Sequence, residues 1–189
     1  MNDRNSGDIL IFFGSPHPHG DTAALVDILM EELPGRCTLV DCWREDIHPC
    51  TDCRACRSQR GCAVEDGMQE IYRRIETCEG IVIASPVWFS GLTGRLLDTA
   101  SRFQRYYSAR AFRQEKLIRR SGKGGMILVG GGNGSPENAI QTAGMLLSQL
   151  NIRDRYPPVL SMRTDTVPAA EDESAIQAVR GLAEFLKRG

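Results

Sequence analysis

The sequence has no apolar run long enough to cross a membrane or to act as a secretory signal. The run Ile9–Phe13 is the first apolar stretch, and polar residues dominate the eight positions before it. A membrane helix needs about 20 apolar residues, and a signal core needs about 7 to 15. We therefore expect a cytoplasmic protein with no membrane association.

A strong charge of either sign is also lacking. The chain holds 23 basic and 24 acidic residues, a net charge of −1, which argues against general nucleic-acid binding. The basic residues are uneven, however, and one segment, 95–123, is rich in them: Arg95, Arg102, Arg105, Arg110, Arg113, Lys116, Arg119, Arg120 and Lys123. This segment is either a solvated helix face and loop or a docking surface for an anionic nucleotide or a partner subunit.

Repeats, linkers and low-complexity tracts are absent, so residues 1–189 are expected to form a single domain with one core. Short apolar runs alternate with amphipathic segments along the chain. The predicted strands are 8–13, 37–41, 80–85, 125–130 and 156–160, and the predicted helices are 23–33, 65–78, 93–107, 137–150 and 171–187. This alternation predicts an α/β fold in which helices cover both faces of a five-stranded parallel sheet.

The loop after the first predicted strand has the composition of an anion site. Residues 14–22 contain two glycines, two prolines and the hydroxyls of Ser15 and Thr22, and a helix follows at once, with Asp21 or Thr22 as its predicted N-cap. Backbone N–H groups and the helix dipole favour an anion there. The loop matches neither the dinucleotide fingerprint nor the P-loop, so a terminal monophosphate is the expected ligand.

Four of the seven cysteines fall within thirteen residues, in the loop 47–62 after the second predicted strand. Cys50, Cys53, Cys56 and Cys62 have the spacing C-x2-C-x2-C-x5-C. Successive C-x2-C steps suit an iron-sulfur cluster, whereas structural zinc usually takes two separated pairs. Three possibilities stay open on spacing: a cluster, zinc, or a loop without metal that holds free thiols or one disulfide.

Two more loops leave strands at the same edge of the predicted sheet. One carries the sequence Ser-Pro-Val-Trp-Phe at 85–89, and the other is the glycine-rich segment 131–134. Ligands of parallel α/β sheets bind beyond the carboxyl ends of the strands. We therefore expect the ligand site at this edge, which these loops share with the anion loop and the cysteine loop.

Together these loops resemble the NAD(P)H-dependent FMN reductase-like branch of the flavodoxin-like fold, and the cysteine spacing resembles its iron-sulfur flavoprotein group. The resemblance implies a flavodoxin-like three-layer sandwich that binds FMN, with NADPH or NADH as electron donor. It places the FMN phosphate at Ser15, His17 and Thr22, with Asp21 and Ala23 as further cofactor-binding residues. It places the flavin ring along Pro86, Val87, Trp88 and Phe89 and beside Gly131, Gly132 and Asn133. It also implies a [4Fe-4S] cluster on Cys50, Cys53, Cys56 and Cys62. Such loops usually carry Arg or Lys at position 17 and Asn at position 21, where this chain has His17 and Asp21.

The resulting hypothesis is an FMN-dependent oxidoreductase that relays electrons between a cluster and FMN. The alternatives are an electron carrier or flavin-based redox sensor without its own substrate, and a flavin reductase without a cluster. A ferredoxin-type partner would suit the carrier. Five aromatic residues near the predicted site predict a homodimer or homotetramer that covers them: Trp88, Phe89, Phe103, Tyr106 and Tyr107. No side chain stands out as a catalytic acid or base.

Overall fold

The computed structural model describes residues 8–188. Six strands form its sheet: β1 (Ile9–Phe13), β2 (Cys37–Asp41), β3 (Gly80–Pro86), β4 (Gly122–Gly130), β5 (Ile152–Arg155) and β6 (Val159–Met162). Six helices surround it: α1 (Asp21–Glu32), α2 (Met68–Thr77), α3 (Gly94–Ser101), α4 (Gln104–Arg113), α5 (Glu137–Gln149) and α6 (Glu173–Lys187). No helix in this part of the chain is long and apolar enough to cross a membrane.

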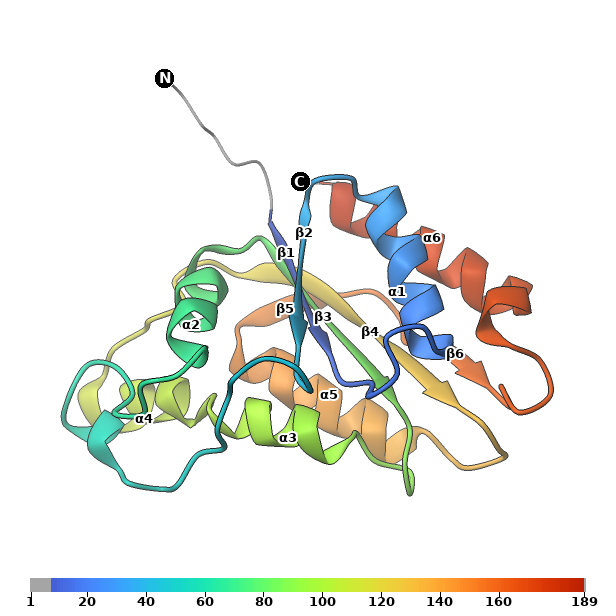
Figure 1. The fold of residues 1–189 in the computed structure, drawn as a ribbon. Coiled ribbons are helices and arrows are strands. Elements are labelled where there is room, and N and C mark those ends of the chain that lie inside the picture. The colour runs from blue at the N-terminus through green and yellow to red at the C-terminus, as the bar shows by residue number, and fades with distance from the viewer. Residues whose placement is uncertain (1–7, 189) are drawn as a thin grey trace.

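The sheet has the order β2-β1-β3-β4-β5, and every pairing in it is parallel (Figure 1). The predicted α/β fold with a flavodoxin-like parallel sheet is thereby confirmed. Because the chain moves from β1 outward to β2 and then back across to β3, the strand order reverses between β1 and β3. Ligands of such sheets bind at this switch point.

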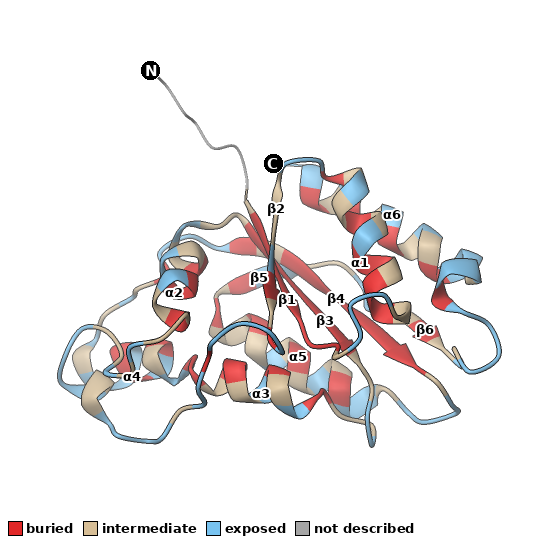
Figure 2. Cartoon of the chain, viewed as in Figure 1, coloured by how far each residue is buried: buried red, intermediate tan, exposed pale blue. Residues whose placement is uncertain are grey.

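Two apolar layers hold the sandwich together, one on each face of the sheet (Figure 2). Strand residues alternate between the faces, so that Ile9 and Ile11 pack against α1 and α6, whereas Leu10 and Phe12 pack against the helices on the opposite face. The second layer takes Tyr72 from α2 and matching residues of α3, α4 and α5. The continuous apolar runs of β1 and β3 are thus explained by burial on both sides.

The fifth strand position differs from the prediction of one strand at 156–160. It is filled by two short strands in tandem, since β5 pairs with the first part of β4 and β6 pairs with its last part. Pro157 and Pro158 lie between them. Proline has no N–H to donate to a ladder, which explains why the pairing is interrupted there.

The helix predicted at 93–107 is also two helices, α3 and α4. The N–H groups of Arg102 and Phe103 bond to carbonyls three residues back, which turns the chain between the helices. Helix α4 then continues to Arg113, through residues whose apolar pattern is too weak to predict a helix, and ends at Gln114 in a left-handed conformation (φ 56°).

The start of α1 corrects a further prediction. Gly20 is the cap residue, and no side chain caps the helix, so neither Asp21 nor Thr22 acts as N-cap. The Asp21 carboxylate instead accepts a hydrogen bond from the N–H of Ala169 at 2.7 Å, which ties α1 to the segment before α6. The first N–H groups of α1 consequently remain available at the switch-point edge.

Candidate functional site

A cavity of about 330 Å³ opens at the carboxyl edge of the sheet. Its walls come from the loops after β1, β3, β4 and β6. The residues that line it are Ser15, His17, Gly20, Asp21, Thr22, Pro86, Val87, Trp88, Val129, Gly131, Thr164 and Asp165. The predicted loops after β1, β3 and β4 line this cavity, whereas the cysteine segment 50–62 does not.

One end of this cavity has the chemistry of an anion site. The Ser15 hydroxyl is buried and accepts a hydrogen bond from the N–H of His17 at 3.2 Å, which shapes the loop before α1. Thr22 is buried in the first turn of that helix. The uncapped helix terminus points its dipole at the same place. His17 is the one basic side chain on the wall and Asp21 and Asp165 are both acidic, so an anion there depends mainly on N–H groups and hydroxyls.

The opposite wall of the cavity is apolar, and contacts with neighbouring residues hold it in place. The N–H of Val87 bonds to the carbonyl of Val129 at 2.7 Å, which holds the loop after β3 against β4. The Trp88 ring meets the Trp43 ring edge-on, with centroids 6.3 Å apart, and the Trp43 indole N–H bonds to the carbonyl of Gly14. This wall offers flat contact area to a planar ligand.

Four predicted cofactor residues do not line the cavity. Ala23 is buried in the core, and Phe89 is fully exposed at the tip of a tight turn with φ 50°. Gly132 and Asn133 are exposed beyond the cavity rim. The sequence prediction in turn lacks Thr164 and Asp165, because nothing in the sequence marks the loop after β6 as part of this edge. It also lacks Trp43, which does not line the cavity but contacts Trp88.

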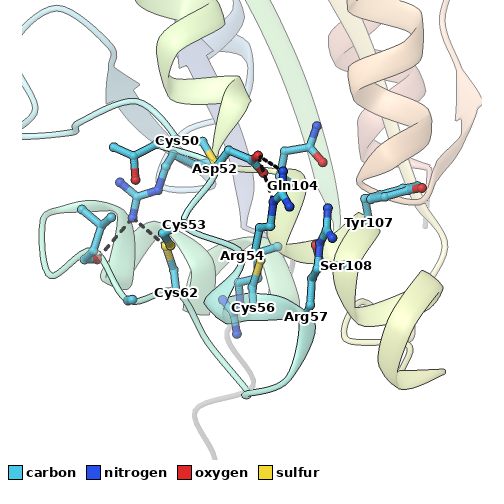
Figure 3. A pocket seen from close by; sticks show the side chains of 15 residues that line it. Cys50, Asp52, Cys53, Arg54, Cys56, Arg57, Cys62, Gln104, Tyr107 and Ser108 are labelled. Carbon is cyan, nitrogen blue, oxygen red and sulfur yellow. Dashed lines mark hydrogen bonds and ion pairs between the residues drawn. The ribbon is translucent and has the colours of Figure 1, made fainter.

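The four clustered cysteines line a second, smaller cavity of about 60 Å³ (Figure 3). Its other wall is the N-terminal half of α4, including Gln104, Tyr107 and Ser108. All four cysteines are free thiols. Among residues 8–188 no group of three His, Cys, Asp or Glu side chains is close enough to hold a metal ion. The four sulfur donors therefore surround one space without being drawn together around a metal.

Contacts from α3 and α4 hold the cysteine loop. The Ser101 hydroxyl accepts a hydrogen bond from the N–H of Cys50 at 2.8 Å. The Arg113 guanidinium donates to the carbonyl of Cys56, and Arg57 of the loop stacks on Phe112 with 4.6 Å between the guanidinium carbon and the ring centre. The loop is thus anchored at its start and at its middle.

Four arginines among the nine basic residues of the segment 95–123 are buried or half-buried and have partners within the protein, whereas Arg110, Lys116, Arg119 and Arg120 are exposed. Arg95 and Arg113 donate to the carbonyls of Cys42 and Cys56, and Arg105 pairs with Glu76 at 2.9 Å. Arg102 is buried, as one side of an ion pair with Asp66. These four arginines have partners within the protein and are at most about a third exposed, so for them neither a solvated face nor an anion-docking surface holds.

Helix α3 connects the two cavities. Its cap residue Thr93 donates a hydrogen bond to the carbonyl of Gly14 at 2.7 Å, beside the first cavity, and its last residue Ser101 binds Cys50 at the second. An eight-residue helix is about 12 Å long. The cysteine loop leaves the sheet edge after Trp43 and runs along this helix, so the two cavities share no residue.

The three cysteines outside the loop differ from the clustered ones. Burial raises the pKa of Cys42 to about 12, and the same cause raises the pKa of Cys78 to about 12 and that of Cys37 to about 11. A raised pKa keeps the thiol protonated at neutral pH, and the thiolate is the metal ligand and nucleophile. Cys42 is fully buried, while Cys37 and Cys78 are half-buried.

A parallel α/β sheet with the switch-point order, an uncapped helix terminus and an apolar wall at one edge defines a flavodoxin-like protein with a nucleotide-type cavity. Residues 8–161 match the NADPH-dependent FMN reductase family. The match covers most of the chain, and the chain belongs to this family. The resemblance proposed from the loop sequences is thereby confirmed.

The chain is also similar to named iron-sulfur flavoproteins. An iron-sulfur flavoprotein of Methanocaldococcus jannaschii is 28% identical over 132 residues, which cover 68% of this chain and 65% of the relative. One of Methanosarcina thermophila is 32% identical over 99 residues, or 52% of this chain and 49% of the relative. The matched stretch spans about half to two-thirds of these relatives' own lengths.

Solved structures share the fold at low identity. The NAD(P)H:quinone oxidoreductase of Methanothermobacter marburgensis superimposes with a TM-score of 0.70 at 14% identity, covering 96% of both chains. An FMN-dependent NADH-azoreductase of Bacillus anthracis in complex with FMN gives 0.65 at 14% identity, covering 95% of this chain and 99% of the other. At these identities the likeness establishes the fold alone.

The cysteine environments predict selective alkylation. In metal-free protein at pH 8, iodoacetamide should modify Cys53, which is exposed, rapidly, and Cys42 at least about 100-fold more slowly, because a thiol with a raised pKa contributes little thiolate. Peptide mass spectrometry of timed samples measures both rates. Denatured protein, in which all seven cysteines should react alike, serves as the control. Equal native rates would contradict the assignment of Cys42 to the core.

Proposed function

We propose that the chain is an FMN oxidoreductase that takes its electrons from NADH or NADPH and exchanges them with an iron-sulfur cluster on the cysteine loop. The cavity at the switch point supports FMN binding, because the N-terminus of α1, which suits a phosphate, and a flat apolar wall line the same cavity. The chain belongs to a family described as NADPH-dependent FMN reductases, and this supports the same cofactor.

The residues present fit FMN at both ends of the cavity. Ser15, Thr22 and the first N–H groups of α1 would bind the phosphate. Pro86, Val87 and Trp88 would lie against the ring system, and Trp43 would keep Trp88 in place through its edge contact. When bound, FMN supplies the hydride chemistry. The protein's own task is to bind it, orient it and limit the access of water.

The cysteine loop fits an iron-sulfur cluster by donor type and location. Its four free thiols surround one cavity, and α3 and α4 anchor the loop around it. Thiolates are the usual ligands of such clusters. Relatives that are 28% and 32% identical to parts of this chain are called iron-sulfur flavoproteins. A cluster held here by Cys50, Cys53, Cys56 and Cys62 would lie at the far end of α3 from the FMN cavity.

FMN is expected to bind more tightly than riboflavin, by at least about tenfold, since hydrogen bonds to a charged group contribute about 1.5–3 kcal/mol. Fluorescence titration of the apo protein measures both affinities. His17→Ala should weaken FMN binding, because it removes the one basic side chain on the cavity wall.

The matched control is His19→Ala. His19 is exposed in the same loop but does not line the cavity, so its replacement should leave both affinities unchanged. Equal affinity for FMN and riboflavin would rule out the phosphate site.

The reductase activity is tested by mixing FMN-loaded protein with NADPH or NADH without oxygen. We expect the flavin absorbance to bleach at least about 100-fold faster than that of free FMN with the same donor, because the protein orients the two reactants. Stopped-flow absorbance measures the rate. Bleaching by reduced ferredoxin but not by either nicotinamide would replace the reductase with an electron carrier.

The cluster is tested on protein prepared and reconstituted without oxygen. It should hold about four iron and four sulfide per chain, the content of a cubane on four cysteines. Cys56→Ser should lose the iron and keep FMN, whereas Cys37→Ser, outside the loop, should keep both. Metal and sulfide analysis gives the answer. Zinc, or no iron, in the wild-type protein would refute the cluster.

A further inference from the structure

The buried ion pair between Arg102 and Asp66 lies against the cysteine cavity. Each side chain is only 1% exposed, and Arg102 Nη1 is 2.6 Å from Asp66 Oδ2. Burial on its own would raise the pKa of Asp66, but the hydrogen bond from Arg102 and those from backbone N–H groups outweigh it and lower that pKa. The pair is therefore fully charged at neutral pH.

The Arg102 guanidinium contacts the loop on both sides of the cavity. Its Nη1 donates to the carbonyl of His48 at 2.8 Å, just before Cys50. Its Nη2 donates to the sulfur of Cys62 at 3.4 Å and to the carbonyl of Val64 at 3.3 Å. A single side chain thus closes the loop between its first and fourth cysteines.

The partner carboxylate reinforces the same closure. Asp66 Oδ2 accepts a hydrogen bond from the N–H of His48 at 3.0 Å, and Oδ1 accepts one from the N–H of Met68 at 3.1 Å. The neighbour of Arg102, Ser101, binds the N–H of Cys50. The end of α3 consequently holds both ends of the cysteine loop.

The arginines inside the loop sequence are placed differently. They have other partners: Arg54 pairs with Asp52, Arg57 stacks on Phe112, and Arg60 pairs with Glu115. Arg54 and Arg60 are well exposed, with 62% and 71% of their side chains accessible, so solvent screens their charge. Arg102 is the buried cation that touches a cysteine sulfur among the described residues.

A gain in folding stability is a weak explanation for the buried Arg102–Asp66 ion pair. A buried ion pair loses hydration on both charges, and a well-packed apolar pair is often as stable. Arg102 Nε also has no hydrogen-bond partner. The direct contact between Arg102 and the sulfur of Cys62 instead indicates that the positive charge acts on the cysteine cavity.

We propose that Arg102 is a positioning residue for Cys62: held by Asp66, it fixes the fourth sulfur at the cavity and places a buried positive charge beside it. The proposal rests on the proposed cluster. Hydrogen bonds to ligand sulfurs and local charge set cluster potentials, so Arg102 should raise the potential of a cluster bound there.

The test compares Arg102→Gln with Asp66→Asn. Both variants break the same ion pair, but the first removes a positive charge and the second a negative one. In reconstituted protein, a dye-coupled redox titration should show a more negative cluster potential for Arg102→Gln and a more positive one for Asp66→Asn. Shifts in the same direction, or no shift, would overturn the charge role, since a purely structural loss has no reason to change sign.

Two further variants distinguish the effect of the Arg102 charge from a nonspecific effect of substitution. Arg102→Lys keeps the charge but cannot reach both sides of the loop, so it should keep a potential nearer the wild-type value while losing iron faster. Arg110→Gln removes an equal charge from α4, where Arg110 bonds to Gln149, and should change neither potential nor iron content. An Arg110→Gln shift as large as that of Arg102→Gln would also overturn the proposal.

A metal-free measurement distinguishes failure of this proposal from failure of the cluster. Trypsin cuts after arginine, and the loop offers Arg54, Arg57 and Arg60. Without iron, Arg102→Gln and Asp66→Asn should be cleaved there at least about tenfold faster than wild type, and Arg110→Gln at the wild-type rate. Unchanged cleavage refutes the loop closure even if the cluster forms. A wild type that takes up no iron refutes the cluster and the charge role, while trypsin still decides the closure.

Discussion

The parallel ladder between β1 and β3 is the constraint on which the rest of this structure depends. Those strands pair from Ile9 with Gly80 to Phe13 with Ala84, which fixes the loops after both strands at one edge. Strand order reverses at this pair, and the chain that enters α1 diverges from the chain that enters α3. The cavity between them follows from that divergence. Its chemistry comes from what the loops carry: hydroxyls and a helix terminus on one side and an apolar wall on the other.

Helix α3 connects this edge of the sheet to the cysteine loop. The Thr93 hydroxyl bonds to the loop after β1, and Ser101 and Arg102 bond to the cysteine segment, so one short helix contacts both cavities. A rigid helix fixes their separation in a way that a loop could not.

The two cavities differ in the fixed positive charge beside them. The cavity at the sheet edge has little fixed positive charge, so hydroxyls, N–H groups and a helix dipole would carry anion binding. The cysteine cavity has a buried guanidinium already paired with a carboxylate. Arginine suits this place because its planar fork can serve two carbonyls, a carboxylate and a sulfur at once, which the single ammonium of lysine cannot.

The sequence alone determined the layers, the parallel sheet and the family, because buried runs such as Ile81–Ala84 and loops such as Gly14–Thr22 are local signals. It could not predict the split of the fifth strand, the break after α3, or the contribution of Thr164 and Asp165. Nor could it distinguish Arg102 from eight other basic residues in its segment. Only the tertiary structure decided these points, because burial and contact join positions far apart in the chain, as Arg102 is joined to His48 and Cys62.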